Sequence, residues 1–111
     1  MFQVTTPNSK VYGSNQHESV IINKSATDTE LDGNIEEIHF PWLEHPYLRS
    51  SGNKIEVFDS SFFKNGPLIA TATYNERTLN LIFGTRQCLV GFNGGITVGG
   101  KIVSTVTPEA L

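Results

Sequence analysis

The stretch GNKIEVFDS, residues 52–60, alternates apolar and polar side chains directly after a Gly-Asn pair. Its apolar residues Ile55 and Val57 fall on one face of a strand, and the charged residues beside them fall on the other. Because Gly and Asn tolerate the positive φ angles of tight turns, the stretch predicts a hairpin that joins strands at 47–50 and 54–59. One face of this hairpin is expected to line a core.

Further alternating segments follow the hairpin at short spacing. Glycine and asparagine separate them, and no window of eleven residues keeps a helical apolar period, so little helix is expected. Successive strands at such spacing favour antiparallel neighbours, so we expect residues 47–106 to form one meander. Its remaining predicted strands are 68–74, 78–83, 87–92, 96–98 and 101–106.

The first third of the chain carries an internal repeat of eighteen residues. Val20 lies eighteen residues before Ile38, and Val11 lies eighteen residues before Thr29. Short strands at a fixed period are typical of the stacked coils of a β-solenoid. Since two copies fall short of the three that normally define a repeat, ordinary hairpins stay open as an alternative. We expect solenoid-like strands over 10–40 that pack on the meander.

Length and composition predict a single all-β domain over residues 1–111. A chain of 111 residues with 38% hydrophobic residues suits one compact core. The predicted architecture is an antiparallel β-sandwich or rolled sheet, with solenoid-like strands in the N-terminal third. Its expected core residues are Val20, Ile22, Ile38, Phe40, Ile55, Val57, Leu79, Leu81, Phe83 and Val90.

Charge and cysteine content exclude several classes of protein. Eight Lys and Arg against eleven Asp and Glu give a net charge of -3, which argues against a nucleic-acid partner. No run of eighteen apolar residues occurs, so no membrane span is expected. Cys88 is the single cysteine and lies in an apolar strand, which predicts a buried, inert thiol.

The segment DTELDG, residues 28–33, resembles the opening of a calcium-binding loop. Asp28, Glu30 and Asp32 place oxygen ligands at alternate positions before a glycine. His39 stands where a bidentate glutamate would complete the coordination. Calcium is therefore possible only if other loops supply ligands, and the alternative is a row of acids on the solvent-exposed face of a strand.

The stretch FPWLEHPY, residues 40–47, has the composition of a loop that contacts a sugar or a peptide. Two prolines hold the chain extended, and Trp42, His45 and Tyr47 combine flat rings with polar groups. The alternative is that Trp42 and Leu43 close an open end of the core. No nucleophile, base and orienting group can be assembled from the sequence, so an enzyme is not expected.

The order of motifs resembles a β-rich segment of bacterial repeat-in-toxin and surface-layer-like secreted proteins, the hemolysin-type family. The likeness is carried by KVYGSNQHESVIINKSATDTELDGNIEEIHFP, then YLRSSGNKIEVFDSS, PLIATATY and TLNLIFGTRQCLVGFNGGITVGGKIVS, which cover most of residues 10–104. The family's calcium-binding Gly-Gly-x-Gly-x-Asp repeats are missing, because residues 13–18 contain no Asp.

The resemblance implies an extracellular or cell-surface setting, reached without an N-terminal leader, whereas a stand-alone leaderless protein would be cytoplasmic. We therefore expect a non-catalytic structural or adhesive module of a bacterial secreted protein. Its expected partners are other domains of that protein or a surface glycan. The alternative function is a glycan- or peptide-binding module, which calcium could assist.

Overall fold

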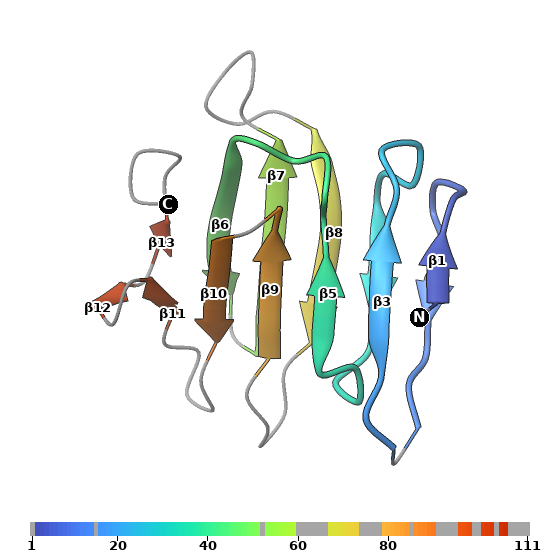
Figure 1. Ribbon diagram of the computed structural model, residues 1–111, viewed down its shortest axis with the longest axis horizontal. Helices are drawn as coiled ribbons and strands as arrows, with labels where there is room; N and C mark the ends of the chain where they lie inside the picture. The colour runs from blue at the N-terminus through green and yellow to red at the C-terminus, as the bar shows by residue number, and fades with distance from the viewer. Residues whose placement is uncertain are drawn as a thin grey trace.

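The computed structural model describes residues 2–14, 16–51, 53–59, 67–73, 79–84, 86–90, 96–98, 101–103 and 105–106. Throughout this part of the chain the regular elements are β-strands, so the predicted all-β fold is confirmed. The strands form two sheets, which lie one behind the other in Figure 1. Both sheets contain parallel and antiparallel pairs, whereas the sequence predicted antiparallel pairs alone outside the first third.

The first sheet has seven strands in the order β1-β3-β5-β9-β10-β11-β12. Strands β1, β3, β5 and β9 run parallel to one another, and β9 to β12 are antiparallel neighbours. Its strands are β1 (Phe2–Val4), β3 (Ser19–Ile22), β5 (Glu37–His39), β9 (Leu79–Phe83), β10 (Arg86–Val90), β11 (Ile96–Val98) and β12 (Lys101–Val103).

The second sheet has six strands in the order β13-β6-β7-β8-β4-β2. Ser51 at the end of β6 lies opposite Lys54 at the start of β7, which confirms the predicted hairpin. Strands β8, β4 and β2 continue this sheet in parallel. Its strands are β2 (Lys10–Val11), β4 (Thr29–Leu31), β6 (Pro46–Ser51), β7 (Lys54–Asp59), β8 (Leu68–Thr73) and β13 (Thr105–Val106).

From β1 to β5 the chain crosses to the other sheet after every strand. Parallel neighbours cannot be joined by a tight turn, so each pair within one sheet is linked through a strand of the other. Val20 lies in register with Ile38, as the eighteen-residue repeat predicts, and Phe2 in register with Val20 adds a third copy of that spacing.

The six-stranded sheet departs from that spacing. Val11 lies in register with Leu31, so the eighteen-residue spacing between Val11 and Thr29 does not correspond to a pairing in this sheet. The link between β3 and β4 is longer than the link between β1 and β2, whereas the link between β4 and β5 is shorter than the link between β2 and β3. The repeat is therefore eighteen residues in one sheet and twenty in the other.

The prediction of one meander over residues 47–106 is also wrong. Strands β6 to β8 lie in the six-stranded sheet, whereas β9 to β12 lie in the seven-stranded sheet. Strand β8 pairs with β4 and strand β9 pairs with β5, both in parallel, because β4 and β5 present open edges in the two sheets. The early strands thus extend the later ones edge to edge, and both contribute to the one core between the sheets.

The core lies between the two sheets. Nine of the ten predicted core residues are buried, and the side chain of Val90 lies outside the described part. The row Val20, Ile38, Leu81 and Cys88 runs in register across four strands of the seven-stranded sheet, and each side chain is almost fully buried. Such a row removes apolar surface from water along the whole stack.

One corner of the winding depends on a close approach of two backbones. The Asp32 Oδ1 atom accepts hydrogen bonds from the backbone N–H of Gly13 at 2.9 Å and of Asn34 at 3.0 Å. A Cβ atom at Gly13 would lie 2.8 Å from both the carbonyl carbon and the carbonyl oxygen of Asn34. Glycine is therefore required at residue 13 for steric reasons.

We predict that Gly13→Ala and Gly13→Asn both destabilise the protein, by about 1–3 kcal/mol, because the new Cβ atom forces the backbone of Asn34 to move. Gly84 is the matched control, since its φ of 66° favours glycine while a Cβ there would meet nothing within 4 Å. Gly84→Ala should cost about 1–2 kcal/mol, and Gly84→Asn less, because Asn tolerates this region. Urea unfolding measures all four. Recovery of stability by Asn at residue 13 would contradict the steric account.

Candidate functional site

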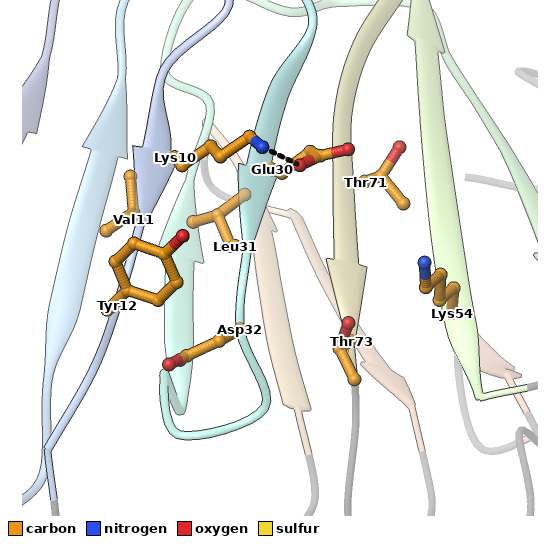
Figure 2. Close-up of a pocket in the computed structure, with 9 residues that line it drawn as sticks. All are labelled: Lys10, Val11, Tyr12, Glu30, Leu31, Asp32, Lys54, Thr71 and Thr73. Carbon is orange, nitrogen blue, oxygen red and sulfur yellow. Dashed lines mark ion pairs between the residues drawn. The ribbon is translucent and has the colours of Figure 1, made fainter.

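The outer face of the six-stranded sheet carries a shallow groove with a volume of about 160 Å³. Figure 2 shows that its side chains come from four neighbouring strands or their ends, β2, β4, β8 and β7. Their registers place polar groups side by side, because residues two apart on a strand share a face. The polar members are Lys10, Glu30, Asp32, Lys54, Thr71 and Thr73.

An exposed aromatic ring forms one side of the groove. Tyr12 directly follows β2 and exposes 74% of its surface, and Figure 2 shows its hydroxyl directed toward β4. A tyrosine offers a flat apolar face together with a polar group, which suits contact with an amphipathic ligand. The groove therefore joins a ring to a set of hydrogen-bonding groups.

The groove is lined by two lysines, Lys10 and Lys54, and two acidic residues, Glu30 and Asp32. The Lys10 Nζ atom lies 3.9 Å from the Glu30 Oε2 atom, and both side chains are more than 60% exposed. An exposed pair of this kind adds little to stability, so both groups stay available to a ligand. Among the described residues no carboxylate forms an ion pair with Lys54. One carboxylate oxygen of Asp32 is engaged at the corner with Gly13.

A second hollow, of about 420 Å³, opens at the end of the stack where β1 and β2 form the sheet edges. Phe2 and Tyr12 flank it, and they are the large hydrophobic residues most exposed in the described part of the chain, at 62% and 74%. Two buried core residues, Val20 and Ile35, also line it. The hollow therefore reaches as far as the core at this end, where Val20 and Ile35 form part of its lining.

The predicted calcium residues do not converge. Asp28 is exposed, with a φ of 58°, and lines a small hollow together with Glu30. Glu30 is paired with Lys10, and Asp32 faces the corner at Gly13. Within the described residues no three acidic, histidine or cysteine side chains form a group that could hold a metal ion. Calcium binding at these positions stays a prediction.

The residues of the predicted aromatic site lie in the link between β5 and β6 or on β6, and the contacts of Trp42 and Tyr47 go to different parts of the molecule. The Trp42 indole N–H donates to the carbonyl of Ile22 at 2.7 Å, and its ring packs against the core. Tyr47, on β6, makes an edge contact with the ring of Phe58 on β7, at 6.1 Å between centroids. His45 is exposed and has an interaction partner. Trp42 is thus half-buried against the core, and ligand binding by Trp42, His45 and Tyr47 stays a prediction.

A polar cluster lies on the outer face of the seven-stranded sheet. Glu37 accepts hydrogen bonds from the side chains of His39 and Ser19. These bonds, that of His39 first, hold the pKa of the Glu37 carboxyl below its usual value near 4.5, although partial burial opposes them. The carboxylate lies between the hydroxyl and the imidazole, so His39 is not placed as a base for Ser19.

Sequence reasoning missed Tyr12 and Phe2 as surface residues of interest. A signal for Tyr12 lies in the alignment of NSKVYG, residues 8–13, with DTELDG, residues 28–33. Asn8 and Asp28 share a φ of 58°, and the strands that follow them pair in register. Tyr12 therefore occupies the position of Asp32 in the preceding copy, on the last strand of the sheet.

Comparisons with protein-family models, with curated proteins and with solved structures gave no match. Within the described residues no helix is long and apolar enough to cross a membrane. Function is therefore inferred from the residues and their geometry.

We predict that the Glu37 carboxylate stabilises the fold above pH 4.5 and that this contribution disappears as pH falls through its lowered pKa. The folded-state pKa is depressed, so the folded protein binds the proton less readily than the unfolded chain. Glu37→Gln should lower the melting temperature at pH 6, and the difference from wild type should shrink toward pH 3. Glu30→Gln, in an exposed ion pair, is the control and should change stability by less than about 1 kcal/mol. A pH-independent difference for Glu37→Gln would contradict this.

We predict that Cys88 does not react with thiol reagents in the folded protein. Burial raises the pKa of its thiol to about 11, so roughly one thiol in a thousand is ionised at pH 8. The thiol reagent dithiobis(nitrobenzoic acid) should label no cysteine under native conditions and one cysteine per chain in denaturant. Rapid labelling of the native protein would place Cys88 at the surface.

Proposed function

We propose that this chain is a non-catalytic structural or adhesive module of an extracellular protein, and that it joins a second copy of itself through β1. The observation that carries the proposal is the open end of the stack, where two exposed aromatic residues flank a hollow above the core. Natural sheets usually protect their edges with charges, prolines or bulges. β1 has the sequence Phe-Gln-Val and contains no charge and no proline.

The backbone of β1 is suited to pairing with another strand. The N–H of Asn23 donates to the carbonyl of Val4 at 3.0 Å, so Val4 presents its backbone toward β3. Successive residues of a strand present their backbone groups to opposite edges, which directs the N–H and C=O of Gln3 outward. Figure 1 shows β1 at one side of the molecule, with no described strand beyond it.

A two-fold axis at Gln3 makes this edge self-complementary. Two antiparallel copies of β1 would place Gln3 opposite Gln3, and the two residues would exchange both backbone hydrogen bonds. Phe2 of one copy would then lie opposite Val4 of the other, on the side of the hollow. Lys10, the nearest cation on β2, is already paired with Glu30, so little charge repulsion opposes the contact.

Two further observations support the non-catalytic, extracellular part of the proposal. In the described residues the shifted titrating groups are Glu37, held between Ser19 and His39, and Cys88, whose thiol is buried. Neither is placed to act as an activated nucleophile or base. The extracellular setting rests on the resemblance of residues 10–104 to repeat-in-toxin and surface-layer-like secreted proteins.

Sedimentation velocity over a range of concentrations tests the association. We expect the mass of the wild-type protein to rise from 12.2 kDa toward twice that value. Gln3→Pro should stay monomeric, because it removes the outward N–H while leaving the hydrogen bonds of β1 to β3 in place. Gln3→Ala keeps the N–H and is the matched control, which should associate like wild type.

Thermal melts of both variants establish that the fold is retained. A wild-type protein that stays monomeric up to about 1 mM, where a contact of about 4 kcal/mol would half-associate, overturns the proposal. Equal association of Gln3→Pro and wild type would show that β1 is not the contact.

A further inference from the structure

We propose that the groove on the outer face of the six-stranded sheet binds a neutral oligosaccharide, with the ring of Tyr12 as its stacking surface. The site differs from the proposed contact between copies through β1, because β1 does not line the groove, although Lys10, Val11 and Tyr12 line both hollows. It is also separate from Trp42, His45 and Tyr47, which do not line the groove.

The position of the groove favours recognition by side chains. It runs across strands β2, β4, β8 and β7, of which β4, β8 and β7 are paired on both sides and β2 is the edge strand. A peptide that binds by adding a strand needs an open edge, which the sheet face over β4, β8 and β7 lacks. The side chains of Thr71 and Thr73 and the charged groups beside them point out of the sheet (Figure 2). The hydroxyls can donate and accept hydrogen bonds, the ammonium groups donate and the carboxylates accept. This combination suits the hydroxyl groups of a sugar.

The charge of the groove favours a neutral ligand. Lys10 and Lys54 supply two positive charges, and Glu30 and Asp32 supply two negative charges, so the lining has no net charge. A phosphate or carboxylate group on a ligand would be attracted by the lysine ammonium groups and repelled by the carboxylates beside them. A ligand rich in hydroxyls can donate to the carboxylates and accept from the ammonium groups at the same time.

Tyr12 supplies the apolar part of the contact. Its ring is 74% exposed at one side of the groove, and no ring contact engages it among the described aromatic pairs. The face of such a ring suits the apolar face of a sugar.

The dimensions of the groove predict a short chain of sugars bound weakly. Four adjacent strands span roughly 14 Å at ~4.8 Å per strand, which is longer than one sugar ring requires. The volume of about 160 Å³ is well below the roughly 300 Å³ at which drug-sized pockets begin. We therefore expect a dissociation constant on the order of 1 mM, which two linked copies of the groove would improve through avidity.

Amide chemical shifts recorded during titration test this proposal. The probes are maltotetraose, cellotetraose and chitotetraose, with tetragalacturonate as the acidic counterpart. We expect at least one neutral probe to shift amides along the groove, with no loss of affinity in about 0.5 M sodium chloride, which screens exposed charges. Tyr12→Ala should weaken binding roughly tenfold, Thr73→Val about fivefold, and Tyr12→Phe should retain it.

Gln3→Pro is the control that separates the two proposals, because it lies outside the groove and should bind the probe like wild type even where association is lost. The saccharide proposal is overturned if no neutral probe shifts groove amides, or if only tetragalacturonate binds and salt abolishes it. Undiminished binding by both Tyr12→Ala and Thr73→Val also overturns it. Should Tyr12→Ala fail to fold, Thr73→Val alone decides the outcome.

Discussion

The in-register row of Val20, Ile38, Leu81 and Cys88 is the contact on which the rest of the structure depends. Parallel pairing of β3, β5 and β9 brings Val20, Ile38 and Leu81 together, and antiparallel pairing of β9 with β10 adds Cys88. The chain must cross to the other sheet between β3 and β5. The crossing strands then build the second sheet, whose buried face closes over the same core. Core and topology therefore arise from one requirement, which is to bury a repeated apolar position against its own copy.

Periodicity along the sequence predicted the local elements well. The hairpin of β6 and β7, the burial of Leu79, Leu81 and Phe83, and the register of Val20 with Ile38 all follow from alternation and spacing. Partner choice could not be predicted in the same way. The sequence of a strand such as β9 shows which of its faces is apolar, but it does not show which strand β9 will pair with. The edge of β5 and the preceding strand β8 are both possible partners, and β9 pairs with β5.

The predicted site residues show a similar division. The sequence singles out residue types that can bind a ligand, but what each side chain contacts depends on what folds next to it. Trp42 donates its indole N–H to Ile22, and Asp32 holds a corner where Gly13 approaches Asn34. Both are polar groups that satisfy backbone atoms between neighbouring turns of the winding. Tyr12 attracts attention only after the preceding strand β2 is placed at an edge, because no further described strand of that sheet lies beyond it.

The insertion of β6 and β7 between β5 and β8 determines the order in which the chain can fold. The two strands of this hairpin are neighbours in sequence, so we expect the hairpin to form early and with a small loss of conformational entropy. Strands β8 and β9 must instead find β4 and β5 across the whole inserted segment. Folding is therefore limited by this long-range closure, and until it occurs the parallel edges of β4 and β5 stay open to partners in other chains.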